Sequence, residues 1–249
     1  MFRHIPGASD VQVPSSVPAV NLVRLHALPL DGTMWTTETY PEFDCVIAPT
    51  LYELGESLET WAGSILDLAG NGPLMLFGSS VGGSCALEVA RLAPDRVAAL
   101  VLVGAKAAHR PEPRFRDEAI RVLTDGGMAE GWPRYWEPLF ANHADPAVVD
   151  TARRIAFQQD IGDVIRGVRT FHSRRDQTEF VRSWQKPLVV ISGDEDRTPS
   201  PTTASTLAAS APKGGFHLVE GAGHYVSLER PSATAHILQE VLQDVTDHP

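Results

Sequence analysis

Short apolar runs alternate with amphipathic segments along most of the chain, and no other feature limits the possible folds as strongly. The runs are rich in β-branched residues and bounded by Pro or Gly, which is typical of strands that a parallel sheet buries on both faces. The segments between them carry apolar residues at spacings of three and four, as helices do. The alternation predicts a doubly wound, mostly parallel α/β sheet. Its strands are expected at residues 21–28, 44–50, 73–78, 97–104, 187–193 and 216–221.

One long interval interrupts this alternation. Residues 106–185 contain several helical stretches and no convincing strand. A connection of this length is too long for a simple crossover between neighbouring strands, so it must form a layer of its own. We therefore expect a core domain built from residues 1–105 and 186–249, with residues 106–185 as a helical cap above the strand ends.

Charge and cysteine content exclude several classes of protein. With 31 acidic and 21 basic side chains, the net charge of −10 opposes binding to nucleic acid or to an anionic membrane. Cys45 and Cys85 lie far apart without CxxC spacing, so we expect two buried thiols rather than a disulfide or a zinc site. The sequence contains no pattern typical of a signal peptide or a membrane span, which makes the cytoplasm the expected location.

The turn "GSSVGG" at residues 78–83 follows an apolar strand and precedes a helical segment. A phosphate-binding loop would need a Lys that this turn lacks, and a G-x-G-x-x-G dinucleotide loop would need Gly where Ser80 stands. The spacing of Gly78, Ser80 and Gly82 fits G-x-S-x-G instead. In that pattern, small flanking residues permit a sharp strand-to-helix turn that exposes the central serine.

Ser80, rather than the serine before it, is the candidate nucleophile. Ser79 would have Phe77 and Val81 as its flanking residues, and neither can take the role of glycine across such a turn. Ser80 would project above the sheet, and the backbone N–H of Val81 at the helix start would face a developing oxyanion. Because Gly and Ser are common, this pattern needs an acid and a histidine elsewhere to indicate an active site.

An acid and a histidine each follow a later strand. Asp196 lies in "GDEDRTPS" after the fifth predicted strand, and His224 lies in "GAGHYV" after the sixth. In this arrangement Ser80 would attack a carbonyl, His224 would take the proton and later deliver it to the leaving group, and Asp196 would orient the imidazole. The three residues together predict a catalytic triad in the order Ser, Asp, His.

These segments resemble the α/β-hydrolase family, and the resemblance extends over nearly the whole chain outside the cap and residues 1–20. It is greatest for small esterases, enol-lactonases and cofactor-free haloperoxidase-like members. The resemblance implies that the acid is the Asp three residues after the strand-ending Gly, which selects Asp196, and that His224 is the base. Asp194 and Glu195 are then expected to form an acidic turn that caps the next helix. The resemblance is carried by "LHALPLDGTMW", "LFGSSVGG", "APDRVAALVLVGA", "ISGDEDRTPS" and "GAGHYVSLERP".

The resemblance also implies an oxyanion hole formed by the backbone N–H groups of Leu28 and Val81. By position, His26 would hold the loop that carries Leu28 rather than transfer protons. Ala27 stands where the family usually has glycine, which weakens the assignment because Ala resists positive φ. A second departure is the short N-terminal region, which can supply one or two edge strands at most and so leaves room for fewer than the family's eight strands.

Candidates for substrate binding lie mainly in the cap. Trp132 and Trp136 would line an apolar acyl pocket or pack the cap itself, and Trp35, with Met34 just after the oxyanion loop, has the same two interpretations. One or two cap arginines turned inward would bind a substrate carboxylate in fork geometry. The other cap aromatics are Phe115, Tyr135, Phe140 and Phe157, and the arginines are Arg110, Arg114, Arg116, Arg121, Arg134, Arg153, Arg154 and Arg166.

The expected function is hydrolysis of a small-molecule ester, thioester or lactone through an acyl-enzyme on Ser80, without a cofactor or a metal. The expected partner is the small-molecule acyl substrate, and neither nucleic acid nor a membrane is expected to bind. The sequence leaves open whether the chain forms a homodimer. Two alternatives remain. One is C–C bond cleavage that uses the same triad, and the other is a ligand receptor of the same fold with little turnover, which the intact triad disfavours.

Overall fold

Six parallel strands form one sheet in the described part of the chain, which is residues 20–35, 43 and 45–247 of a computed structural model. Each neighbouring pair in the sheet is parallel. All six predicted strands are present, so the predicted fold class is confirmed. Across the sheet the order is β2 (Val46–Ile47), β1 (Asn21–Leu25), β3 (Leu74–Ser79), β4 (Val97–Val103), β5 (Leu188–Gly193) and β6 (Gly214–Val219).

Helices cover both faces of the sheet, which explains why its central strands are continuous apolar runs. Alternate side chains of β3 enter two different cores: Leu74 and Leu76 pack on one face, and Met75 and Phe77 on the other. The first face is covered by α1 (Leu58–Leu68), α2 (Val81–Leu92), α6 (Thr178–Ser183) and α7 (Pro201–Ser210). The second face is covered by α8 (Val226–Glu229) and α9 (Pro231–Asp247).

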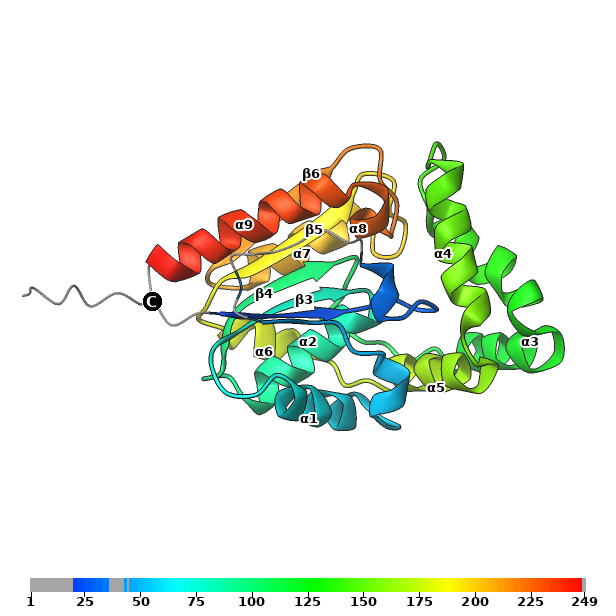
Figure 1. The fold of residues 1–249 in the computed structure, drawn as a ribbon, viewed down its shortest axis with the longest axis horizontal. Coiled ribbons are helices and arrows are strands. Elements are labelled where there is room, and N and C mark those ends of the chain that lie inside the picture. Colours follow the sequence, from blue (N-terminus) through cyan, green and yellow to red (C-terminus); the bar gives the residue numbers. More distant parts are fainter. Residues whose placement is uncertain (1–19, 36–42, 44, 248–249) are drawn as a thin grey trace, which may run out of the picture.

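Three longer helices lie beyond the carboxyl ends of the strands, where Figure 1 shows them in green: α3 (Pro113–Gly131), α4 (Pro146–Gln158) and α5 (Ile161–His172). Two short elements, η3 (Trp132–Trp136) and η4 (Glu137–Leu139), connect α3 to α4. We refer to residues 113–172 as the cap. The next helix, α6, does not join the cap, because its Val181 packs in the same core as α7. The cap therefore covers the edge of the sheet at which β3, β4, β5 and β6 end.

The two cysteines differ in exposure, contrary to the prediction that both are buried. Cys85 is buried in α2, whereas Cys45 is exposed. Cys45 precedes β2, a two-residue strand at the edge of the sheet. Its backbone carbonyl accepts a hydrogen bond from Leu22 N at 2.8 Å, so the backbone is paired while the side chain faces outward. An apolar run on an edge strand does not guarantee burial, and the prediction for Cys45 is wrong.

Three further points concern the organisation of the chain. The edge strands expected near the N-terminus fall within residues 1–19, outside the described residues. Among the helices that the structure describes, none combines the length and apolar character needed to cross a membrane. The predicted start of the last helix at Pro231 agrees with the observed start of α9.

Candidate active site

Ser80 occupies a sharp turn between β3 and α2. With φ of 54° and ψ of −113°, it is the one non-glycine residue with positive φ among those described. Such a conformation is unfavourable for a residue with a side chain and persists only where the surrounding structure fixes it. Ser80 N donates to Val103 O at 2.8 Å, and Ser80 O accepts from Gly83 N at 3.0 Å. The turn therefore holds Ser80 at the carboxyl edge of the sheet in a strained backbone conformation.

The glycines on either side of Ser80 make this turn sterically possible. A Cβ atom on Gly78 would lie 2.4 Å from Gly82 O, and a Cβ on Gly82 would lie 2.1 Å from Leu25 O. Both contacts are with backbone atoms, which cannot move aside as a flexible side chain could. The absence of these two side chains lets the start of α2 pack against the end of β1. Ser79 is instead the last residue of β3, and its buried hydroxyl has no hydrogen-bond partner within the described part of the chain.

Asp196 and His224 meet at the ends of β5 and β6. His224 Nδ1 lies 3.0 Å from Asp196 Oδ2 and 3.2 Å from Oδ1, and both side chains are buried. Thr198 N donates to Asp196 Oδ1 at 2.8 Å, which fixes the carboxylate from a second side. Because Nδ1 faces a carboxylate, it carries the ring proton in neutral His224. The other ring nitrogen, Nε2, is then the one that can accept a proton.

Ser80 and His224 line the same cavity, which has a volume of about 290 Å³ and lies under the cap. Tyr135, Trp136 and other side chains of the cap cover it. The cavity therefore brings the predicted nucleophile and base together, and the buried Asp196 lies behind His224. The described residues that line it are Leu28, Ser80, Gly104, Ala105, Lys106, Phe115, Ala119, Arg134, Tyr135, Trp136, Pro138, Leu139, Val168, Phe171, His172, Thr198 and His224.

The loop after β1 brings Leu28 to this cavity, and His26 holds that loop in place. The His26 ring is fully buried, and its Nε2 accepts a hydrogen bond from Leu51 N at 2.8 Å. The proton therefore sits on Nδ1, 3.1 Å from Ala27 O. Burial lowers the pKa of His26 to about 4, so the ring is neutral at physiological pH. Ala27 does not have positive φ, and glycine is therefore not required at this position.

Sequence and structure comparisons place the chain in a known family. A profile described as "Alpha/beta hydrolase family" matches residues 22–237. The chain belongs to the α/β-hydrolase family. The structure of a thermophilic esterase from Thermogutta terrifontis with malate bound is 26% identical, with a TM-score of 0.81 over 92% of this chain and 91% of that chain.

Two curated proteins are similar to this α/β hydrolase over part of its length. The polyketide synthase ThaQ of Burkholderia thailandensis is 30% identical over 178 residues, which are 66% of this chain and 8% of ThaQ. The lipase LipV of Mycobacterium tuberculosis is 28% identical over 152 residues, which are 52% of this chain and 54% of LipV. The matched region thus spans about half of LipV and a small part of ThaQ. Family membership and the likeness to an esterase and a lipase support a hydrolase.

Only one of the three tryptophans predicted to bind substrate lines the cavity of the hydrolase. Trp136 is among the lining residues. Trp132 is buried and packs against Phe140 with ring centroids 6.1 Å apart, and Trp35 packs against Phe77 at 4.8 Å. Neither Trp35 nor Trp132 is among the described residues that line the cavity. The structure therefore places these two in the core.

The basic residues that line the cavity are mostly not the cap arginines that the sequence suggested. Of the eight arginines considered, Arg134 alone is among the described lining residues, and it forms an ion pair with Glu118. Lys106 and His172 also line the cavity, and the sequence patterns did not single them out. Burial and the guanidinium of Arg174 lower the pKa of His172 to about 4. The one available signal for Lys106 is its position just after a predicted strand.

Tyr225, which directly follows His224, ties the base loop to the loop of Leu28. Its hydroxyl donates a hydrogen bond to Leu28 O at 2.8 Å. Burial raises the pKa of Tyr225, so this hydroxyl stays protonated and remains a donor. The two loops come from strands that are not neighbours in the sheet, and Tyr225 connects them directly.

The cap is bonded to the base loop at what we call the near junction, formed by residues 139–142 with residues 223–229. Glu229 is buried, and its carboxylate accepts hydrogen bonds from Gly223 N at 3.0 Å and from Ala141 N at 2.9 Å. His224 N donates to Leu139 O at 2.7 Å. Burial raises the pKa of Glu229. One carboxylate therefore holds both the cap and the residue that precedes the base.

Glu195 adds a further bond between the cap and the acid loop. Its Oε2 accepts a hydrogen bond from Asn142 N at 2.8 Å. Asp194 Oδ1 accepts one from Ala222 N at 3.3 Å. The next helix, α7, is capped by Ser200. The prediction that Asp194 and Glu195 cap that helix is therefore wrong, because their carboxylates accept hydrogen bonds from backbone N–H groups of other loops instead.

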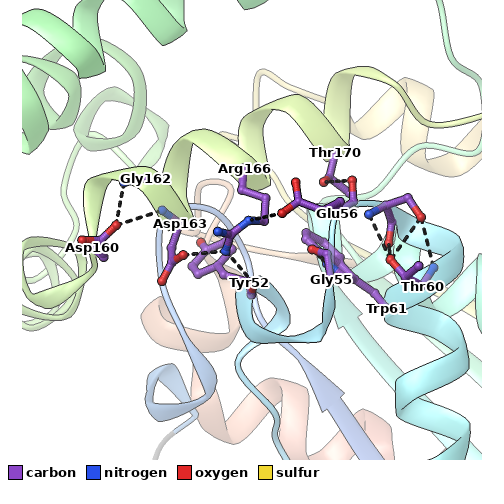
Figure 2. Close-up of polar contacts among 11 residues, drawn as sticks. Tyr52, Gly55, Glu56, Thr60, Trp61, Asp160, Gly162, Asp163, Arg166 and Thr170 are labelled. Carbon is purple, nitrogen blue, oxygen red and sulfur yellow. Dashed lines mark hydrogen bonds and ion pairs between the residues drawn. The ribbon is translucent and has the colours of Figure 1, made fainter.

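The opposite end of the cap meets the sheet domain at the far junction, where α5 contacts η2 (Leu51–Leu54) and the residues before α1 (Figure 2). Arg166 Nε donates to Glu56 Oε1 at 3.0 Å, and Arg166 Nη1 donates to Tyr52 O at 3.0 Å. Thr170 Oγ1 donates to Glu56 O at 3.2 Å. The side chain of Glu56 is 83% exposed and that of Arg166 is 32% exposed, so solvent reaches the carboxylate of this ion pair.

Proposed function

We propose that this α/β hydrolase is a serine hydrolase of small-molecule carboxylic esters, thioesters or lactones. Ser80 is the nucleophile, His224 is the general base and acid, and Asp196 orients the imidazole. One observation carries the proposal: the strained turn holds Ser80 in the same cavity as a histidine whose other ring nitrogen is bonded to a buried carboxylate. The likeness to an esterase and a lipase supports the ester class.

The reaction proceeds in two halves. Ser80 Oγ attacks the carbonyl carbon while His224 Nε2 takes the hydroxyl proton, and His224 then delivers that proton to the leaving alkoxide or thiolate. A water molecule attacks the resulting acyl-enzyme, with its proton again passing to His224 Nε2. Collapse of the second tetrahedral intermediate releases the acid and returns the proton to Ser80. Asp196 stabilises the imidazolium in both halves without accepting its proton.

The backbone N–H groups of Leu28 and Val81 are the proposed oxyanion donors. Val81 is the first residue of α2, where backbone N–H groups lack a partner within the helix and the helix dipole favours negative charge. Leu28 lines the cavity from the opposite loop, and the hydrogen bond from Tyr225 to Leu28 O restrains that residue. Two such donors stabilise the negative charge that develops on the carbonyl oxygen in the transition state.

The nucleophile can be tested without knowledge of the natural substrate. A fluorophosphonate probe followed by peptide mass spectrometry should place the label on Ser80. With 4-nitrophenyl acetate and butyrate, Ser80→Ala should lower kcat/KM by at least about a thousandfold, as expected for loss of a catalytic nucleophile. Ser79→Ala is the matched control and should retain activity. Labelling at another serine, or full activity in Ser80→Ala, would refute the proposal.

A further inference from the structure

Cations line the cavity that holds Ser80 and His224, and carboxylates do not. Lys106 and Arg134 both border the cavity, and no Asp or Glu is among the described residues that line it. The chain as a whole has the opposite balance, with 31 acidic against 21 basic side chains. The lining of the cavity is therefore positively charged, although the chain as a whole carries a net negative charge.

The strand order places Lys106 on one side of Ser80 and Leu28 on the other. Lys106 follows β4, which lies between β3 and β5 in the sheet. Leu28 follows β1, on the other side of β3. Leu28, Ser80 and Lys106 all line the same cavity. A carbonyl oxygen directed toward Leu28 therefore leaves the Lys106 side of the cavity for other groups of the substrate.

Lys106 has an unusual environment for a lysine. Its side chain is half-buried, and no hydrogen bond or ion pair connects its ammonium group to another residue that the structure describes. Burial and the guanidinium of Arg174 lower the pKa of Lys106, while Glu112 and Asp196 act in the opposite direction. A cation removed from water is normally paired, because desolvation without a counter-charge is unfavourable. A carboxylate in the cavity would supply the counter-charge for Lys106.

Three other basic residues lie at or behind the cavity, and they differ in charge and exposure. Arg134 is half-exposed at the edge of the cavity, where its pairing with Glu118 leaves less of its charge for a ligand. His172 lines the cavity and, with its pKa lowered to about 4, is a neutral N–H donor at physiological pH. Arg174 is buried behind it and donates to Phe171 O at 2.6 Å. Lys106 is therefore the cation in the cavity that is neither paired nor fully exposed.

We propose that the substrate carries a carboxylate, which Lys106 binds beside the reacting carbonyl. The inference rests on the proposed serine-hydrolase function and narrows its substrate class to acidic esters, thioesters or lactones. The carboxylate belongs either to the acyl part or to the alcohol part of the substrate, since both parts occupy the cavity before the leaving group departs. A lysine of the sheet edge, rather than an arginine of the cap, is then the main determinant of this specificity.

Two pairs of esters test the preference and distinguish the two positions of the acid. The acyl pair is 4-nitrophenyl hydrogen glutarate and 4-nitrophenyl 5-methylhexanoate, in which an isopropyl group replaces the carboxylate at nearly equal size. The alcohol pair is 3-acetoxybenzoate and 3-isopropylphenyl acetate, which differ in the same way. In each pair the measured quantity is the ratio of kcat/KM for the acidic ester to kcat/KM for the neutral ester.

Lys106→Met should lower this ratio in at least one pair by about ten- to a hundredfold, as expected for loss of a charge-assisted contact in a partly buried site. Lys106→Arg, which keeps the cation, should stay within about threefold of the wild type because charge rather than shape is the main term. The matched control is Lys213→Met, which removes the same charge from an exposed position and should leave both ratios unchanged. Circular dichroism of each variant verifies that it is folded.

A binding measurement separates failure of this inference from failure of the proposed function. Isothermal titration of glutarate into Ser80→Ala protein should show binding that the additional change Lys106→Met removes, whether or not the chain hydrolyses esters. If the wild type hydrolyses the neutral esters but Lys106→Met leaves both ratios within about twofold, the proposed function stands and the inference is wrong. Glutarate binding that is unaffected by Lys106→Met would also overturn it.

Discussion

The near and far junctions hold the same cap to the same sheet domain in different ways. The near junction uses a buried carboxylate and backbone groups next to His224, whereas the far junction uses an ion pair between the partly exposed Arg166 and the exposed Glu56, beside a hydrogen bond from the buried Thr170. Buried hydrogen bonds to a charged group contribute more than exposed ion pairs, which are typically worth less than about 1 kcal/mol. The comparison indicates that the near junction bonds the cap directly to the loop of His224, whereas the far junction does not.

Among changes at the two junctions, the largest expected effect comes from a methyl group added at the near junction. In Gly223→Ala, the new Cβ would lie 2.4 Å from Leu139 O and 2.5 Å from Ala141 N, so either the cap or the base loop must shift. We expect kcat/KM for 4-nitrophenyl butyrate to fall by about a hundredfold, because a displacement of the base by 1 Å is enough for such a loss. The matched control is Gly63→Ala in α1, where a Cβ meets nothing within 4 Å. Equal activity of the two variants would contradict the coupling.

His26 provides the next largest effect, through pH. It bonds Leu51 of η2, which adjoins the far junction, and so connects that junction to the loop of Leu28. Its pKa is about 4 in the folded protein against 6.5 in the unfolded chain, so the unfolded chain binds more protons between these values. The free energy of unfolding therefore falls as pH drops from 6.5 towards 4, by at most about 3 kcal/mol from this residue.

His26→Gln should remove this part of the pH dependence. Urea unfolding at several pH values between 4 and 6.5 would show a smaller slope of the free energy of unfolding for the variant than for the wild type. The exposed residue His236 in α9 offers the same substitution as a control. Parallel curves for the wild type and His26→Gln would show that the buried imidazole does not titrate as its surroundings imply.

A matched pair of Glu→Gln variants compares the junctions directly. Glu229→Gln replaces one of the two carboxylate oxygens that accept from Gly223 N and Ala141 N by an amide that cannot accept. We expect a loss of about 2 kcal/mol in the free energy of unfolding and about a tenfold fall in kcat, with a smaller change in KM. Thermal unfolding and steady-state kinetics measure both quantities. A loss of stability without a fall in kcat would show that Glu229 is only structural.

Glu56→Gln should have the smallest effect. It removes the exposed ion pair to Arg166 but keeps the backbone carbonyl that accepts from Thr170. The free energy of unfolding should change by less than about 1 kcal/mol, and kcat/KM should equal that of the wild type within error. An effect as large as that of Glu229→Gln would remove the distinction between the two junctions.

Sequence patterns predicted the parts of the molecule that depend on local chemistry. Strand runs, the glycines around Ser80 and the positions of Asp196 and His224 at strand ends all follow from spacing, because parallel strands bring their carboxyl ends to one edge. Such patterns could not predict contacts between segments that are distant in the sequence. Nothing local distinguishes Glu229 from an exposed helix carboxylate, or the buried Trp132 from the cavity-lining Trp136.

Two other differences between prediction and structure arise from a position at the edge of the sheet and from the direction of a side chain. Cys45 stands in an apolar run, but the two-residue strand that follows it lies at the sheet edge and leaves the thiol exposed. Lys106 occurs in "GAKAAH", where only the fold shows that this residue lines the cavity. The number of arginines in the cap suggested that one of them binds the substrate, but composition gives only how many cations a segment has and not where their side chains lie.

The positive φ of Ser80 lowers the stability of the folded protein in order to keep a serine side chain at this turn. Glycine adopts such a backbone conformation without the steric cost that a side chain incurs, and relief of such strain is worth on the order of 1 kcal/mol. Ser80→Gly should therefore melt at a higher temperature than the wild type while being unable to form an acyl-enzyme. Selection for heat resistance alone would therefore favour glycine over serine at this position.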